Sequence, residues 1–393
     1  MYKNLSSAFI RRIQVSSLLA VLTILSLLFL TASDIMAFPP QNRVTVMSRN
    51  LYVGADIFRI IEAANNPEQG ELSISMAVAE VFQTVQYTNF LERVQTIVDE
   101  IQRYRPHLIG LQEVATILQQ IPGDFLIGNP HPASDVVYDY QKILLEALAT
   151  HKLEYKVAAL VTNADVELPM LAGFDENDGP VFHDIRLIDH DIILVRKDVS
   201  YENPLAQNYH TNISLPIAGV MAEFKRGYTS IDAQIKDSNF HFVNTHLEVS
   251  GGEDNVFSAV QSAQTAELLN IINAKGEPVI LLGDFNSSPE DMIIESDIFG
   301  QIVPPYSQVI AAGYADLATR SKKYPDFTCC FNETLDDPLA SLYERVDHIF
   351  FLPHDFMEIP QTKFKVIGDK QKEMTASGLW PSDHAGVIGI IKF

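Results

Sequence analysis

The sequence of 393 residues contains only two cysteines, and these are the neighbours Cys329 and Cys330. Two adjacent cysteines cannot cross-link distant parts of a chain, which excludes the class of small secreted domains that depend on a disulfide framework. A bond between neighbours would also be strained, so both side chains are expected to serve as small apolar groups. The fold must therefore be stabilised by a hydrophobic core, and a chain of this length can bury a sizeable one.

Basic residues are also scarce, with 28 Lys and Arg against 50 Asp and Glu and a formal net charge of −22 at pH 7. Lys and Arg contacts supply most of the affinity of proteins that bind duplexes without sequence preference. Tight non-specific binding to nucleic acid or to anionic lipid is therefore not expected. A phosphate substrate is not excluded, because a bound divalent cation inverts the local charge.

Only one long hydrophobic run is present, at residues 15–30, and it follows a positive segment that includes Lys3. Small residues up to Ala37 come next. This order is typical of a secretory signal peptide, predicted over residues 1–37, and the alternative is an uncleaved N-terminal membrane anchor. The protein is therefore predicted to be exported, either secreted or periplasmic, with membrane anchoring as the second choice. The remainder, residues 43–393, is expected to form a single domain and a monomer.

Apolar runs that indicate strands alternate along the chain with stretches of helical spacing. Residues 72–105 are predicted to form one helix that Pro106 stops, and residues 163–183 an acidic, turn-rich surface loop. This alternation predicts an α/β protein with mixed sheets and helices outside them. The other predicted helices span 138–151 and 255–272, and the strands are expected at 44–47, 108–111, 155–161, 191–196, 219–224, 229–235, 240–244, 279–282, 346–352 and 386–391.

Polar residues follow or precede many of these apolar runs. The run at 279–282 ends in Gly283-Asp284-Phe285-Asn286, and Ser382-Asp383-His384 stands just before the last strand. A strand that delivers acids and amides at its tip presents them at a site rather than filling a core. The complete set of such residues is Asn50, Glu113, Asp189 or Asp191, His246, Asp284, Asn286, Asp347, Asp383 and His384.

These residue types suit metal-assisted hydrolysis of a phosphate ester. Carboxylates and amides hold a hard divalent cation through oxygen, a carboxylate can orient or deprotonate water, and imidazoles neutralise phosphoryl oxygens and transfer protons. The structural alternatives are a turn amide for Asn50 and an ion pair with Arg345 for Asp347.

The set also resembles a known family. The motifs occur in the order found in the endonuclease/exonuclease/phosphatase superfamily, and the resemblance spans about residues 43–393: Asn50, Leu111-Gln112-Glu113, Asn244-Thr245-His246, Gly283-Asp284-Phe285-Asn286, Arg345-Val346-Asp347-His348 and Ser382-Asp383-His384. Placement of the polar set at strand ends, with apolar strands that need cover on both faces, predicts the same architecture. This is a four-layer α/β sandwich of two mixed β-sheets flanked by helices, with the site at one end.

The resemblance also implies roles for the metal and water ligands. Glu113 would be the principal ligand of Mg²⁺ or Mn²⁺, with Asn50 beside it, and Asp383 would add to the metal or to the water network. Asp284 would orient or deprotonate the attacking water, and Asn286 would hold that water or a phosphoryl oxygen.

For the histidines, the resemblance implies contacts with the phosphate from two sides. His384 would touch the scissile phosphate, with Asp347 fixing its tautomer. His246 would contact the phosphate from the other side and be paired with an acid, for which Asp189 is the first candidate and Asp191 the second.

The function expected from the residues and the resemblance is an exported, divalent-metal-dependent phosphodiesterase. Its substrate would be a phosphodiester of a nucleic acid or of a phospholipid head group, with a nuclease slightly favoured. The alternative is a sphingomyelinase-like or phosphoinositide-type lipid phosphohydrolase. A second alternative is a catalytically silent binding protein of the same fold.

Overall fold

The computed structural model describes residues 43–66, 70, 72–273, 277–319, 326–353 and 360–392. The predicted signal segment, residues 1–37, lies outside the described residues. Arg43–Phe393 groups into one unit by its internal contacts. Within the described part of the chain, no helix combines the length and the hydropathy that crossing a membrane requires.

The larger of the two main sheets is mixed. Its strands β1 and β2 run parallel, while β1 and β18, and β2 and β6, pair antiparallel. A side branch is formed by β3 (Thr116–Gln120), which pairs with β6 and with β4 (Asp135–Asp139). The strand order is β17 (Gln361–Ile367), β18 (Gly386–Lys392), β1 (Arg43–Asn50), β2 (Leu108–Gln112), β6 (Pro180–Arg196), β5 (Tyr155–Phe174), β9 (Val220–Phe224) and β8 (Ile213–Ile217).

The second main sheet is also mixed, because β11 and β12 pair parallel while their other neighbours pair antiparallel. A separate small hairpin joins β13 (Ile294–Ser296) to β14 (Gly300–Ile302). The order in the second sheet is β15 (Ala315–Asp316), β16 (Asp347–Leu352), β12 (Val279–Asp284), β11 (Ser238–His246), β10 (Gly227–Ile235) and β7 (Ser200–Asn208).

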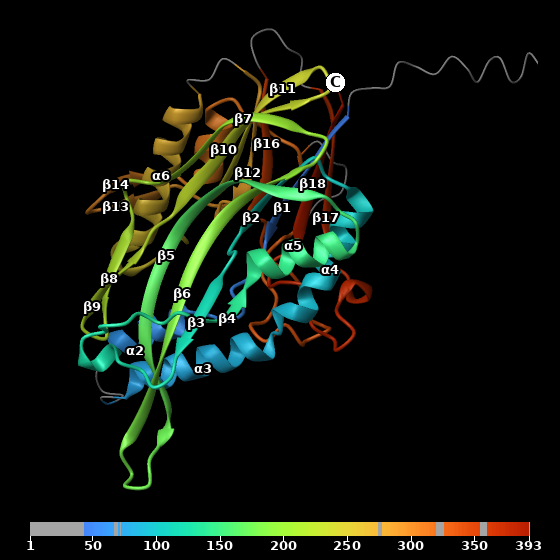
Figure 1. Cartoon of the computed structure of the whole chain (residues 1–393). Coiled ribbons are helices and arrows are strands. Elements are labelled where there is room, and N and C mark those ends of the chain that lie inside the picture. Colours follow the sequence, from blue (N-terminus) through green and yellow to red (C-terminus); the bar gives the residue numbers. More distant parts are fainter. Residues whose placement is uncertain are drawn as a thin grey trace, which may run out of the picture. The chain divides into compact units, whose positions relative to one another are not determined.

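Three apolar clusters separate four layers. One packs the helices α2 (Phe58–Asn65), α3 (Ser73–Tyr87), α4 (Phe90–Tyr104) and α5 (Tyr140–Thr150) onto the larger sheet. The second joins the inner faces of the two sheets, and the third packs α6 (Val256–Ile272) and α7 (Pro305–Ala311) onto the smaller sheet. Figure 1 shows α6 on one side of the sheets and α4 and α5 on the other. The predicted four-layer α/β sandwich is confirmed.

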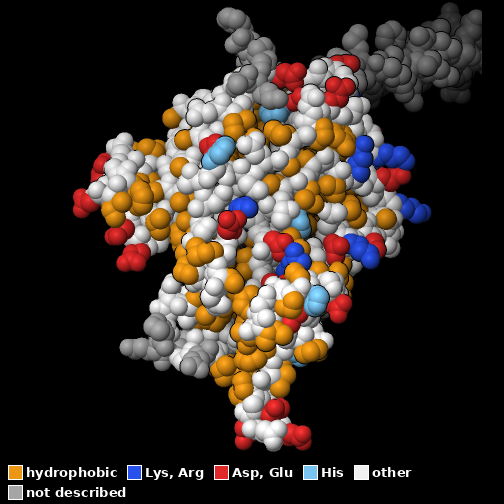
Figure 2. Space-filling view, turned by 60° about the vertical axis from the view of Figure 1, so that its left-hand side comes forward, with side chains coloured by type: hydrophobic (Ala, Val, Ile, Leu, Met, Phe, Trp, Pro, Cys, Tyr) orange, Lys and Arg blue, Asp and Glu red, His pale blue; other side chains and the backbone are white. Residues whose placement is uncertain are grey.

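One predicted loop is wrong. Residues 163–183 belong to the long strands β5 and β6, whose pairing continues from Tyr155 opposite Arg196 to Phe174 opposite Pro180. Only the turn after Phe174 is irregular, and there Asp175 accepts hydrogen bonds from the backbone N–H groups of Asn177 and Gly179. The hairpin projects from the sheet (Figure 1), and Figure 2 shows hydrophobic side chains along its stem and acidic ones at its tip.

Two smaller expectations also differ. The helix predicted over 72–105 is divided into α3 and α4, because Asn89 adopts a left-handed conformation with φ of 41°. The hydroxyl of Thr88 at this break donates a hydrogen bond to the carbonyl of Gly54. Cys329 and Cys330, expected as separate apolar thiols, are bonded to each other.

Candidate active site

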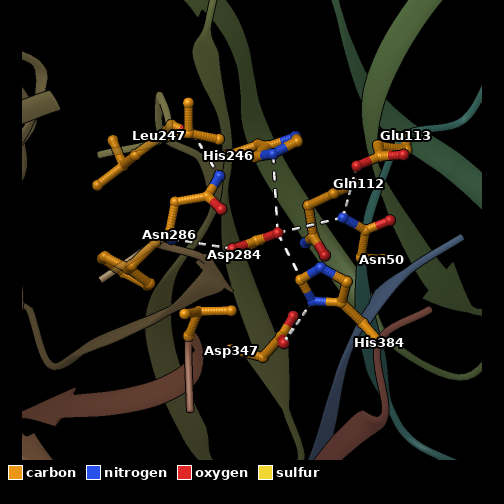
Figure 3. Close-up of polar contacts among 12 residues, drawn as sticks. Asn50, Gln112, Glu113, His246, Leu247, Asp284, Asn286, Asp347 and His384 are labelled. Atoms are coloured by element: carbon orange, nitrogen blue, oxygen red, sulfur yellow. Dashed lines mark hydrogen bonds and ion pairs between the residues drawn. The ribbon is translucent and has the colours of Figure 1, made fainter. Parts of the chain in front are cut away.

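Strand pairing places the predicted polar residues at one end of the two sheets. β11 and β12 are parallel, with His246 opposite Asp284 in the last pair of the register. β12 and β16 are antiparallel, which sets Asp284 opposite Asp347. In the facing sheet β1 ends at Asn50, opposite Gln112 in the parallel strand β2. Parallel strands that end together bring their terminal side chains to the same edge, as Figure 3 shows.

A glycine makes this edge possible. Gly283 has φ of 146°, and a Cβ built on it would lie 1.9 Å from the carbonyl oxygen of Thr245. These two residues are partners in the parallel register of β11 and β12. Close backbone approach therefore holds the end of β12 against β11, directly before Asp284.

The carboxylate of Asp284 lies at the centre of the polar cluster. Its Oδ2 accepts a hydrogen bond from Nδ2 of Asn50 at 3.1 Å. The same oxygen lies 3.7 Å from Nε2 of His246 and 3.8 Å from Nδ1 of His384. Its Oδ1 accepts from the backbone N–H of Asn286 at 2.9 Å. One buried carboxylate thus faces an amide and two imidazoles that come from both sheets (Figure 3).

Asn50 joins Asp284 to Glu113. Its Nδ2 also donates to Oε1 of Glu113 at 2.8 Å, and its Oδ1 accepts from the backbone N–H of Tyr52 at 2.8 Å. Oε2 of Glu113 accepts from the backbone N–H of Val53 at 2.8 Å. Asn50 is therefore more than a turn amide, since its side chain links the last residue of β12 to the acid that follows β2.

A buried arginine from α4 holds the backbone around this edge. Nη1 of Arg93 donates to the carbonyls of Leu51 at 2.7 Å and Pro381 at 2.9 Å, and Nη2 donates to that of Tyr52 at 3.1 Å. The segment after β1 and the segment before Asp383 are thus fixed to the same side chain.

His384 is oriented by Asp347. Nδ1 of His384 lies 2.9 Å from Oδ2 of Asp347, so Nδ1–H donates to the carboxylate and Nε2 is left for another partner. Arg345, the alternative partner for Asp347, instead pairs with Asp316 at 2.8 Å. Burial lowers the pKa of His384, but the charges of Asp347 and Asp284 outweigh it and raise this pKa well above its usual value.

The geometry of strands, acids and histidines agrees with a match of the chain to the model of the Endonuclease/Exonuclease/phosphatase family over residues 85–384. The chain belongs to this family. No curated protein sequence matches it.

Several solved structures are similar to the chain. One is an endonuclease/exonuclease/phosphatase family protein from Bacteroides thetaiotaomicron, 18% identical with a TM-score of 0.52, with 90% of this chain and 98% of that chain covered. Another is truncated TDP2 from Caenorhabditis elegans, at 14% identity and a TM-score of 0.47, covering 89% and 98%. A mannosyl-6-phosphatase from Bacteroides thetaiotaomicron has 18% identity and a TM-score of 0.49, covering 88% and 99%. At 18% identity, the likeness to the first of these shows the fold alone.

Of the two acids that the sequence offered as partners of His246, the structure brings the second, Asp191, to its Nδ1. Nδ1 of His246 lies 3.8 Å from Oδ1 of Asp191. Asp189 belongs to the same group, in which one ligand atom from each of the three residues lies within 4.8 Å of the others. The geometry favours Asp191 over Asp189 as the partner, and a catalytic role for Asp189 stays a prediction.

Asp189 is a buried acid in a crowded part of the site, and the nearby His246 and Arg226 only partly offset the effect of its burial. Its buried Oδ1 has no hydrogen-bond partner among the described residues. Burial, with the neighbouring charges of Asp191 and Glu113, raises the pKa of Asp189 to about 7. Burial lowers the pKa of His246, as does Arg226, but Asp191 and Asp284 outweigh both and raise it.

Arg226 is a site residue that the sequence analysis missed. Its Nη1 lies 3.1 Å from both ring nitrogens of His246, and its Nη2 lies 3.4 Å from Oε1 of Glu248. A basic pair, Lys225-Arg226, between two predicted strands was the available signal. The guanidinium brings a fixed positive charge to the side of the site where His246 was expected to meet a phosphate.

The donor set fits a hard divalent cation. Burial raises the pKa of Asp383 to about 7, and although His384 opposes this, the nearby carboxylates of Glu113 and Asp284 add to it. Oδ1 of Asp347 is buried and has no hydrogen-bond partner within the described residues. Crowded carboxylates that repel one another are relieved by a cation held through oxygen. The structure brings single ligand atoms of Asp284, Asp347 and His384 within 4.8 Å of one another. The assignment of Glu113, Asn50 and Asp383 as metal ligands stays a prediction.

All of the predicted site residues except Asn50, Asp191 and Asp347 line one cavity of about 490 Å³. Near the site its wall carries acids, imidazoles and the amide of Asn286, whose Nδ2 donates to the carbonyl of Leu247 at 2.9 Å. Farther from the site the wall is almost entirely apolar. The structure therefore joins the polar cluster to an apolar chamber that the sequence analysis did not anticipate.

Proposed function

We propose that the protein is an exported, divalent-metal-dependent hydrolase of phosphate esters that acts on phosphodiesters. The observation that carries the proposal is the position of Asp284, whose carboxylate faces Asn50, His246 and His384 at the wall of a cavity. Membership of a family of nucleases and phosphatases supports the reaction class.

The side chains suit distinct tasks in such a reaction. Asp284, held by the backbone N–H of Asn286, orients a water molecule and accepts its proton. His384, kept protonated by Asp347 and Asp284, donates from Nε2 to a phosphoryl oxygen. His246 and Arg226 place positive charge on the opposite side. A Mg²⁺ or Mn²⁺ ion held by Glu113, Asn50 and Asp383 would supply Lewis acidity toward the phosphate.

The competing hypothesis is a catalytically silent binding protein of the same fold. It is disfavoured because the fold alone does not require an acid, an amide and two imidazoles to converge on one point. An activity that depends on those groups separates the two hypotheses.

The test is hydrolysis of bis-p-nitrophenyl phosphate with Mg²⁺ or Mn²⁺, before and after chelation. We expect turnover that chelation abolishes and added metal restores. Asp284→Asn should lower kcat by ~10²-fold or more, whereas the matched change at the exposed acid Asp297 should not. A folded protein without turnover under any metal would refute the hydrolase and favour the binding protein.

A further inference from the structure

We infer that the substrate is an amphiphilic phosphate ester whose long aliphatic chain lies in the apolar part of the cavity while its phosphate lies at Asp284. This inference rests on the proposed function and names the substrate class for the same site. It changes the order expected from the sequence, in which nucleic acid stood slightly ahead of lipid.

Two strands supply one wall of the cavity. In β5 and β6, alternate residues face the same side, and the register sets Ala164 opposite Asp189, with the apolar pairs Val166–Leu187 and Leu168–Ile185 following in turn. A continuous apolar row therefore leads away from Asp189. At roughly 3.3 Å for each strand residue, Ile185 lies about 13 Å from Asp189 along β6.

Two helices supply the opposite wall. Val78, Val81, Phe82 and Val85 of α3 all line the cavity and recur at helical spacing, so they share one face. Ile61 of α2 lines it as well. Both helices lie between Asn50 and Glu113 in the chain, and their apolar side chains border the cavity while they also pack onto the larger sheet.

The charge distribution along the cavity selects the kind of ligand. The Lys and Arg residues that line it are Lys225 and Arg226, and Arg226 is beside His246 at the site. A polynucleotide would carry further phosphates past the first, and each would need a cationic partner. The apolar row offers none, whereas it matches an uncharged hydrocarbon chain.

The size of the cavity is also consistent with such a ligand. About 490 Å³ falls inside the range of roughly 300–1,000 Å³ that is usual for small-molecule sites. Burial of the aliphatic chain of the substrate would supply binding energy at a distance from the reacting bond, and this energy raises kcat/KM.

The test is a series of p-nitrophenyl phosphodiesters whose second ester group is methyl, butyl, octyl or dodecyl, measured below micelle-forming concentrations. We expect kcat/KM to rise with chain length by up to about fourfold per methylene, which corresponds to ~0.8 kcal/mol, and then to level off. A flat series alongside clear turnover of the methyl ester would overturn the inference, as would nicking of plasmid DNA without any chain-length effect.

Blocking the row provides the matched comparison. In Ile185→Trp, kcat/KM should level off at a shorter alkyl chain than in the wild type, while kcat/KM for the methyl ester should be unchanged. Val181→Trp, at a half-exposed position of the same strand that does not line the cavity, should leave the whole series unchanged. If Ile185→Trp fails to fold, Val166→Phe provides the same block, and an unaltered series in a folded blocking variant refutes the inference.

Binding distinguishes this inference from the proposed function. No turnover of the methyl ester with any metal would refute the hydrolase, and calorimetry with dodecyl phosphate and methyl phosphate would then decide the inference alone. Tighter binding of dodecyl phosphate, lost in Ile185→Trp, would support it. Equal binding of the two phosphates would overturn it.

Discussion

Gly283→Ala is expected to damage both stability and activity, because it adds one methyl group at the closest backbone approach in the site. The new Cβ would lie 1.9 Å from the carbonyl oxygen of Thr245, and φ at this position is 146°. The carbonyl belongs to a central strand pair and cannot move away as a flexible side chain would. The contact must be relieved by shifting the end of β12, where Asp284 is the next residue.

A second glycine allows the loss of stability to be separated into a part from backbone strain and a part from the close contact. Gly173 has nearly the same conformation, with φ of 151°, but nothing lies within 4 Å of the Cβ that would be added there. Gly173→Ala should therefore cost only the conformational strain, on the order of 1–3 kcal/mol. Gly283→Ala should cost that strain and the overpacking, a further ~1–3 kcal/mol.

Urea unfolding and steady-state hydrolysis measure the two effects. We expect Gly283→Ala to be less stable than Gly173→Ala by ~1–3 kcal/mol. We also expect its kcat to fall by ~10²-fold, because a displacement of about 1 Å at a reacting group has that effect. Equal destabilisation by the two variants would refute the reasoning from the Thr245 contact. Full activity in Gly283→Ala would show that the position of the Asp284 carboxylate does not depend on the glycine before it.

Three further predictions test the cation site, the phosphate contact and the pH dependence. Glu113→Gln should raise the Mg²⁺ or Mn²⁺ concentration for half-maximal turnover by about tenfold or more, and an unchanged metal titration would contradict its assignment as a ligand. His384→Gln should lower kcat by ~10²-fold with little change in urea stability, and equal kcat values would exclude a role at the phosphate. Burial, with the charge of Arg196, lowers the pKa of His107 to about 4, and its Nδ1 accepts the backbone N–H of Thr45. Because the imidazole binds a proton at higher pH in the unfolded chain than in the folded one, its contribution to stability is present above pH ~6.5 and is lost as the pH falls toward 4. Over this range the free energy of unfolding of the wild type should therefore decline more steeply than that of His107→Asn. The difference should be less than about 1 kcal/mol, because the group is partly exposed.

The strands, and most of the polar residues at their ends, can be predicted from short stretches of the sequence. Apolar runs such as 279–282 mark buried strands, and an acid directly after such a run must lie at the strand tip. Strand tips in an α/β protein gather at an edge, so Asn50, His246 and Asp284 could be placed at one site without coordinates. Which acid would pair with His246 could not be read in this way, because Asp189 and Asp191 both point to the same side of one strand.

The rest of the site depends on pairing across the sequence. Residues 163–183 were predicted as a loop because the turn around Asp175 dominated their composition, although Val166 and Leu168 alternate with acids at a strand period. The helices α2 and α3 carry no motif, so nothing indicated that their apolar faces would line a cavity with β5 and β6. Arg226 lacked a partner in the sequence for the same reason, since its contact with His246 spans two strands.

The position of β18 has a consequence for biosynthesis. This strand enters the larger sheet between β17 and β1, and the guanidinium of Arg49 in β1 donates to the backbone carbonyl of His384, 335 positions later in the chain. A nascent polypeptide that has not yet released residues 383–392 from the ribosome therefore lacks both an acid and an imidazole of the site, and β1 lacks a neighbour. Closure between such distant segments is slow relative to local pairing. The site thus forms only after residues 383–392 have joined β1, and a polypeptide that lacks them does not assemble this edge of the sheets.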